Sequence, residues 1–176
     1  MVFTNRRQSS LFSMFFPPTA APVLHIFTDG SFDPASRHGG WAFVACRAGV
    51  EVASGFGGVS QTTNNTMELM ALLQAARWLH QSAGAEPAVL WSDSGYAVEG
   101  CNRLMPIWRN NGWKVICANA HRRRRTIPDR DLWQAVDVEL DRNPLITVAW
   151  CKGHSGLVGN ERADALAETG RLSIRT

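Results

Sequence analysis

The order of strand-like and helix-like segments constrains the fold of this chain more than any other feature of the sequence. Three segments rich in apolar and β-branched residues come first: Val23 to Thr28, Trp41 to Cys46 and Glu51 to Val59. The connections between them are short, which favours antiparallel neighbours, because parallel strands need a longer crossover. We therefore expect an antiparallel meander at the start of the fold.

Helical and strand patterns alternate after this meander. Apolar residues recur at helical spacing between residues 69 and 79, and Asn65 with Glu68 three positions later has the pattern of a capping box. The later segments are a strand over 88–91, a helical stretch over 95–109, a helical stripe over 132–140, a strand over 145–150 and a helix over 158–169. Together they predict an α/β fold with a mixed sheet and helices packed on it.

The 176 residues are enough for one domain with a sizeable core. We expect a flexible N-terminal extension over 1–20, which contains no acidic side chain, a folded domain over 21–170 and a tail over 171–176. An organelle transit peptide is the alternative interpretation of the Arg- and Ser-containing extension. The cysteines form no C-x-x-C pair, and no apolar run is long enough to span a bilayer. These features predict a cytoplasmic protein that does not contact membranes.

Two aspartates stand at the ends of predicted strands. Asp29 ends the first strand, and Asp93 ends the strand over 88–91. If these strands are parallel neighbours, both carboxylates emerge at the same sheet edge, where α/β proteins place their sites. Clustered carboxylates repel one another, and a hard divalent cation with oxygen ligands would neutralise them. Each aspartate taken alone is equally consistent with a turn former.

Three further residues carry weaker signals when each is taken alone. Glu68 is consistent with the capping role described above. Asp164 lies in the last predicted helix, where Glu161 at i−3 and Glu168 at i+4 are also consistent with a solvated acidic face. His154 stands in a glycine-flanked loop, and a mobile histidine can carry protons near neutral pH.

Basic residues are concentrated in one zone of the sequence. Residues 100–134 contain eight of the 18 lysines and arginines but only two of the 15 acidic residues. Between Trp113 and Trp133 this zone contains a run of four consecutive arginines, namely Arg122, Arg123, Arg124 and Arg125. A local basic zone beside aromatic side chains indicates a nucleic-acid partner, and a solvated loop is the alternative.

Six short motifs occur in a fixed order along the chain. They are Thr28–Ser31 (TDGS), Asn64–Leu69 (NNTMEL), Ser92–Tyr96 (SDSGY), Asp131–Trp133 (DLW), Lys152–Gly156 (KGHSG) and Asn160–Asp164 (NERAD). Any one of these motifs is common by chance, but the ordered set is highly specific. The set resembles type 1 ribonuclease H, the ribonuclease HI family, and the likeness extends from about Leu24 to Ala167.

The resemblance implies a ribonuclease H-like fold: a five-stranded mixed sheet, its first three strands antiparallel, with helices on both faces. It implies a monomeric endonuclease that hydrolyses the RNA strand of RNA/DNA hybrids and leaves 5′-phosphate and 3′-hydroxyl ends. Two Mg²⁺ ions would activate the attacking water and stabilise the leaving 3′ oxygen, and Mn²⁺ suits the same oxygen ligands. The implied metal ligands are Asp29, Glu68, Asp93 and Asp164. His154 would assist proton transfer or product release.

The resemblance also implies residues that bind the substrate. Asn64 and Asn65 match positions that contact the hybrid in the minor groove, where the RNA 2′-hydroxyl is displayed. Thr63 matches a position near a phosphate of the DNA strand. The basic protrusion of the family, which grips the DNA strand, is matched by Trp108, Trp113 and Lys114.

Four departures from the family pattern affect binding positions and leave the implied metal ligands in place. Gly95 stands where many relatives have a polar side chain that helps to read the groove, and Leu104 replaces an aromatic residue of the protrusion. Asp129 replaces an asparagine near a DNA phosphate, where an acid is repulsive. The segment after the protrusion is longer than usual. It carries the run Arg122–Arg125, and we expect these four arginines to compensate by adding phosphate contacts.

Two other functions are compatible with the same fold. One is a module that binds hybrids without cutting them, and the presence of all four carboxylates and the loop histidine argues against it. The other is a different nuclease or a recombinase- or transposase-like enzyme. The Asn64–Asn65 pair and the Trp-rich basic segment favour hybrid cleavage over this second alternative.

Overall fold

The computed structural model describes residues 22–84, 86–115 and 126–174. Five strands form one sheet in the order β3-β2-β1-β4-β5. The first three strands pair antiparallel, and β4 and β5 continue the sheet in parallel with β1, which confirms the predicted mixed sheet. The strands are β1 (Leu24–Asp33), β2 (His38–Arg47), β3 (Val50–Val59), β4 (Ala88–Ser92) and β5 (Ile146–Trp150).

One group of predicted substrate-binding residues lies outside the described residues. It is the arginine run, which consists of Arg122, Arg123, Arg124 and Arg125. Their contacts with phosphates therefore stay a prediction.

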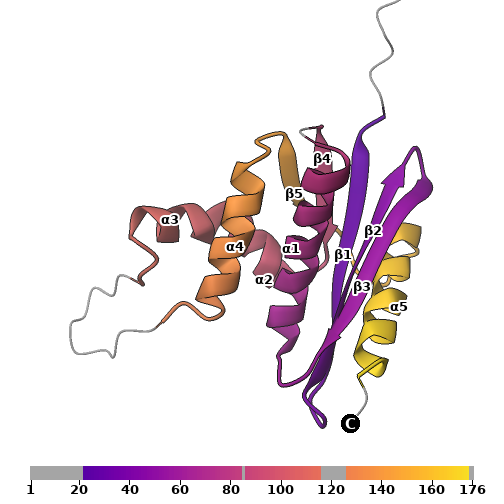
Figure 1. Ribbon diagram of the computed structural model, residues 1–176, viewed down its shortest axis with the longest axis horizontal. Helices are drawn as coiled ribbons and strands as arrows, with labels where there is room; N and C mark the ends of the chain where they lie inside the picture. The colour runs from indigo at the N-terminus through magenta and orange to yellow at the C-terminus, as the bar shows by residue number, and fades with distance from the viewer. Residues whose placement is uncertain (1–21, 85, 116–125, 175–176) are drawn as a thin grey trace, which may run out of the picture.

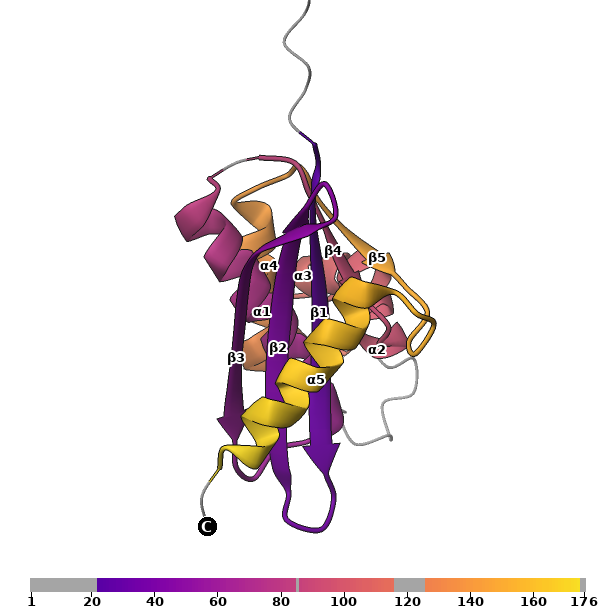
Figure 2. The same ribbon diagram turned by 90° about the vertical axis from the view of Figure 1, so that its right-hand side faces the viewer.

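Helices cover both faces of the sheet, as the resemblance implies (Figures 1 and 2). On one face α1 (Asn64–Ser82) packs on β1 and β2 and is flanked by α4 (Arg130–Asp141). On the other face α5 (Val158–Leu172) lies across β1, β2 and β3. Successive side chains of a strand point to opposite faces, so Leu24 and Ile26 enter the larger core beneath α1 while Phe27 enters the smaller core beneath α5.

The helical stretch predicted over 95–109 is present, but it is not one regular helix. It consists of α2 (Gly95–Glu99), a π-helical turn η2 (Gly100–Leu104) and α3 (Met105–Asn110). Pro106, near the start of α3, has no backbone N–H to donate, which favours a break in the regular pattern of hydrogen bonds at this point. Among the residues that the structure describes, no helix combines the length and the apolar character needed to cross a membrane.

The N-cap of α1 is Thr63, so the prediction that a capping box begins at Asn65 is wrong. The helix begins at Asn64, and Thr63 Oγ1 accepts a hydrogen bond from the backbone N–H of Thr66 at 3.2 Å. Glu68, the predicted second member of the box, is buried instead of folding back to the cap. Its carboxylate is therefore available for another role.

We expect Thr63→Ala to lower the free energy of unfolding by about 1 kcal/mol, because it removes the oxygen that satisfies an N–H of the first turn. Asn65→Ala, at the position of the incorrectly predicted cap, is the matched control and should change stability by less than about 0.5 kcal/mol. Chemical denaturation of both variants measures the two values. Equal losses would contradict the assignment of Thr63 as the cap.

Candidate active site

Asp29 and Asp93 meet at one edge of the parallel pair β1 and β4. The last parallel pair is Thr28 with Ser92, and each aspartate is the next residue in its chain segment. The prediction that the first strand ends at Asp29 is wrong, because β1 continues to Asp33 along its antiparallel partner β2. The two aspartates nevertheless converge, since convergence depends only on where the parallel pairing stops.

The third carboxylate comes from α1, which approaches β1 closely. A Cβ atom at Gly30 would lie 2.6 Å from the backbone nitrogen of Glu68 and 2.8 Å from the carbonyl carbon of Met67. Only a glycine at position 30 leaves room for the helix. The close approach of α1 at Gly30 therefore places Glu68 beside Asp29. One carboxylate oxygen from each of Asp29, Glu68 and Asp93 lies within 4.8 Å of the other two.

The electrostatics of this acidic cluster (Asp29, Glu68 and Asp93) disfavour three negative charges. Burial, and then the charges of Asp93 and Asp164, raise the pKa of Asp29 from 3.8 to about 7. Burial, and then the charges of Asp29 and Asp93, raise the pKa of Glu68 from 4.5 to about 9. The N–H of Gly30 donates to Asp29 Oδ1 at 2.7 Å and offsets a small part of the first shift.

A divalent cation fits this cluster. Glu68 Oε2 is buried and has no hydrogen-bond partner among the described residues, which is costly for a polar atom unless another group binds it. The donors of the cluster are carboxylate oxygens, the ligands that Mg²⁺ prefers. A bound cation would favour the ionised forms of the acids and so remove the cause of their raised pKa values.

Asp164 and His154 lie at the rim of the cluster. Asp164, on α5, is partly exposed and is not one of the three acids that share the 4.8 Å separation, although its charge raises the pKa of Asp29. His154 Nδ1 lies 3.9 Å from Asp164 Oδ2 on an exposed loop. Its φ of 48° is left-handed, a conformation that non-glycine residues adopt infrequently. The structure therefore brings His154 and Asp164 together, beside the three buried or half-buried acids.

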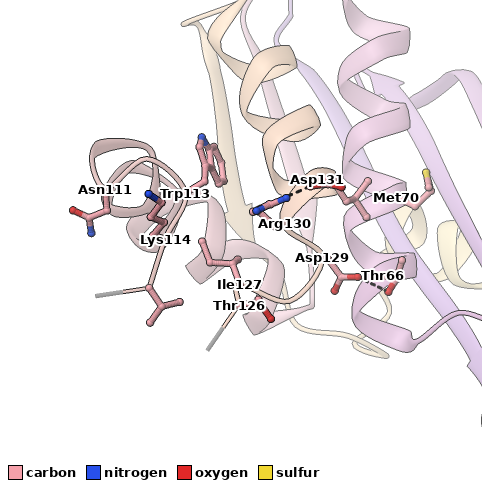
Figure 3. A pocket seen from close by; sticks show the side chains of 12 residues that line it. Thr66, Met70, Asn111, Trp113, Lys114, Thr126, Ile127, Asp129, Arg130 and Asp131 are labelled. Atoms are coloured by element: carbon pink, nitrogen blue, oxygen red, sulfur yellow. Dashed lines mark hydrogen bonds and ion pairs between the residues drawn. The ribbon is translucent and has the colours of Figure 1, made fainter. Parts of the chain in front are cut away.

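Five of the ten residues expected to bind substrate line two neighbouring hollows. The smaller, of about 500 Å³, is lined by Thr63, Asn64, Asn65, Pro128 and Asp129. The larger, of about 970 Å³, lies between α1, the start of α4 and the segment after α3, where Trp113 and Lys114 line one side (Figure 3).

Trp108 is less available than the resemblance implies. Its ring packs edge-on against the buried Trp133, with the ring centroids 5.5 Å apart. Tyr96 packs on Trp133 in the same way and accepts a hydrogen bond from its indole N–H at 3.0 Å. This aromatic group fixes α2 and α3 on α4, so Trp108 is partly a core residue.

Asp129 has a structural partner that the sequence did not reveal. Its Oδ1 accepts a hydrogen bond from Thr66 Oγ1 at 2.9 Å, which joins the start of α4 to the first turn of α1 (Figure 3). Asp129 adopts a left-handed φ of 53°, which Asp and Asn tolerate better than most residues. Of the other departures, Gly95 is exposed with open space around its Cα, and Leu104 is half-buried.

Two residues beside Asp93 were given no role by the sequence. Asn160, on α5, lies with its Nδ2 3.4 Å from Asp93 Oδ2. Gly153 approaches the same oxygen so closely that a Cβ atom there would lie 2.4 Å away. The spacing of Asn160 and Asp164, four residues apart on one helix face, was the available signal for the first of them.

Comparison with known proteins places the chain in one family. The family model described as RNase H matches residues 21–171. The chain is 39% identical over 151 residues to a ribonuclease H of Cupriavidus metallidurans, covering 86% of this chain and 97% of that protein. It is 37% identical over 152 residues to a ribonuclease HI of Pseudomonas putida, covering 86% and 95%.

Solved structures agree with this family. The crystal structure of LC9-RNase H1, a type 1 RNase H with the type 2 active-site motif, superposes with a TM-score of 0.72 at 26% identity, covering 86% of this chain and 72% of that one. A foamy viral protease-reverse transcriptase in complex with RNA/DNA hybrid superposes with a TM-score of 0.74 at 18% identity, covering 99% of this chain and 22% of that one, and shows the fold alone.

Proposed function

Because this chain belongs to the ribonuclease H family, we propose that it hydrolyses the RNA strand of RNA/DNA hybrids with divalent cations held at the acidic cluster. The observation that carries the proposal is the convergence of three carboxylates within 4.8 Å, two of them buried at raised pKa. Such a cluster is unfavourable without a cation, and the buried Glu68 Oε2 lacks a protein partner in the described residues.

We assign Asp29, Glu68 and Asp93 as ligands of the cations, with Asp164 as a fourth ligand that completes the site from α5. Two Mg²⁺ ions bound there would lower the pKa of the attacking water and stabilise the charge on the leaving 3′ oxygen, giving 5′-phosphate and 3′-hydroxyl ends. Mn²⁺ would substitute, because it takes the same oxygen ligands.

Neighbouring groups of the chain would hold the metal ligands in place and assist the reaction. Asp29 is fixed by the Gly30 N–H, and Glu68 is fixed by its place in the first turns of α1. His154, exposed and 3.9 Å from Asp164, is placed to move a proton between the rim of the site and the solvent. We assign it a role in proton transfer or product release, because an imidazole on this exposed loop can contact both the site and the solvent.

Substrate choice is assigned to the first turn of α1 and the surface beside it. The side-chain amides of Asn64 and Asn65 can both donate and accept hydrogen bonds, as recognition of a 2′-hydroxyl requires. Trp113 and Lys114 would contact the DNA strand. Thr63 already caps α1, and its Oγ1 lies 2.7 Å from Thr66 Oγ1, so we expect a weaker phosphate contact there than the family pattern implies.

Cleavage of end-labelled nucleic acids tests the proposed function. We expect Mg²⁺-dependent cutting of the RNA strand of an RNA/DNA hybrid, blocked by EDTA, and no cutting of double-stranded DNA or single-stranded RNA. Cutting of double-stranded DNA would favour a different enzyme with the same fold. Tight hybrid binding without cleavage would favour the binding module. Asp129→Asn would then be the first substitution to test, because the family pattern has asparagine at this position.

The arginine run provides a second test of the substrate. Replacing Arg122, Arg123, Arg124 and Arg125 together with glutamine should flatten the dependence of log Kd on log[salt] for hybrid binding by about three to four units, if each contacts one phosphate. Arg47→Gln is the control, because Arg47 pairs with Glu86 at the other end of the sheet from the acidic cluster. An unchanged slope in the quadruple variant would show that the arginines do not bind phosphates.

A further inference from the structure

The carboxylate of Asp93 is restrained by a segment close to the C-terminal end of the chain. Asn160 Nδ2, in the first turn of α5, lies 3.4 Å from Asp93 Oδ2, at the long end of hydrogen-bonding distance. The backbone of Gly153 closes the space beside the same oxygen. These two contacts limit rotation of the carboxylate and so determine where its other oxygen, Oδ1, points.

Asn160 is itself fixed by a buried thiol. Asn160 is 2% exposed, and its Oδ1 accepts a hydrogen bond from Cys151 Sγ at 3.3 Å. Because the thiol donates to the amide oxygen, the amide nitrogen is the atom left to face Asp93. Cys151 is a free cysteine whose backbone N–H donates to the carbonyl of Ser92 at 3.0 Å, which ties it to the last residue of β4, directly before Asp93.

The same contact links two elements of the site. Asn160 and Asp164 are four residues apart and therefore lie on one face of α5. A hydrogen bond from Asn160 to Asp93 joins that face to the end of β4. The position of Asp164 relative to the acidic cluster thus depends partly on Asn160.

We propose that Asn160 is a positioning residue, which holds Asp93 and the Asp164 face of α5 in the arrangement that binds a divalent cation, and that Cys151 orients its amide. The inference rests on the proposed function, because it assumes that the acidic cluster binds metal. Groups that orient metal ligands without touching the metal typically contribute about 10- to 100-fold to affinity.

Calorimetric titration of the full chain with Mn²⁺, without nucleic acid, tests the proposal. Asn160→Leu keeps the approximate volume and removes the amide, and we expect about 10-fold weaker Mn²⁺ binding or more. Asn143→Leu is the matched control, since Asn143 is 3% exposed and donates to the carbonyl of Glu86, away from the cluster. It should lose stability but bind Mn²⁺ as the wild type does.

A pair of substitutions at Cys151 keeps the test decisive if Asn160→Leu does not fold. Cys151→Val removes the donor and should weaken Mn²⁺ binding by roughly fivefold, equivalent to one hydrogen bond. Cys151→Ser retains a donor and should restore binding. Mn²⁺ affinity unchanged in folded Asn160→Leu, or in Cys151→Val, would overturn the inference while leaving the function in place. A wild-type protein that binds no Mn²⁺ would overturn both.

Discussion

Asp29→Asn is expected to slow cleavage of the RNA strand by about 10³-fold or more. Asp29 lies on β1, which pairs with β4 as far as the residue before Asp93 and packs against α5, the helix that carries Asp164. Asparagine keeps the shape but removes the charge that would hold the cations, and metal assistance to phosphodiester hydrolysis is worth several kcal/mol. The single-turnover rate at saturating Mg²⁺ and saturating hybrid measures the loss.

Asp33→Asn is the matched control for this experiment. Asp33 lies on the same strand, but it accepts hydrogen bonds from the turn at Ala35 and Ser36 and lies four residues beyond the acidic cluster. We expect a cleavage rate close to that of the wild type. Hybrid affinity of Asp29→Asn, measured separately, should be largely retained, so that the loss falls on the chemical step. A near-normal rate in Asp29→Asn would remove this carboxylate from the reaction.

The metal-free protein should lose stability as the pH rises. Asp29 and Glu68 have raised pKa values of about 7 and about 9, so their protonated forms stabilise the folded state. This stabilisation is complete below the ordinary carboxylate pKa values and disappears as the pH rises through the folded ones. We expect the free energy of unfolding to fall by at least about 2 kcal/mol between pH 5 and pH 9, a decrease of roughly 4–8 °C in Tm.

Glu68→Gln separates this effect from other titrations. Glutamine resembles the protonated glutamate, so the metal-free variant should match the wild type at pH 5 and exceed its Tm at pH 9. Mg²⁺ should raise the Tm of the wild type at pH 9 and have a much smaller effect on the variant. The same pH slope in both proteins would show that Glu68 does not destabilise the folded state.

The order of the strands and helices and the choice of candidate acids could be predicted from sequence alone. Apolar periodicity and connection length are local properties, which is why the meander, the later strands and the helices were predicted close to their observed places. The ordered motifs identify Asp29, Glu68, Asp93 and Asp164 as candidate metal ligands from the sequence alone. Their roles remain proposals, but the structure brings the first three together and places the fourth at the rim.

Local sequence patterns gave wrong predictions for the end of β1 and the start of α1, because contacts with other segments determine both. The first strand was expected to stop at Asp29, but a strand continues as long as it has a partner, and β2 provides one as far as Asp33. The capping box was placed at Asn65 because Glu68 follows at the right spacing. The cap is instead Thr63, whose Oγ1 accepts the N–H of Thr66, and Glu68 is directed into the site.

The pKa values of the acids and the contacts that orient them depend on the packing of the whole fold. The pKa values of Asp29 and Glu68 depend on burial and on charges that come from different elements of the fold. The contact of Asn160 with Asp93 joins residues 67 positions apart. Such distances are set by the packing of α1 and α5 on opposite faces of the sheet, which requires the whole core. A short motif contains no information about the distance between its residues and a segment far away in the sequence.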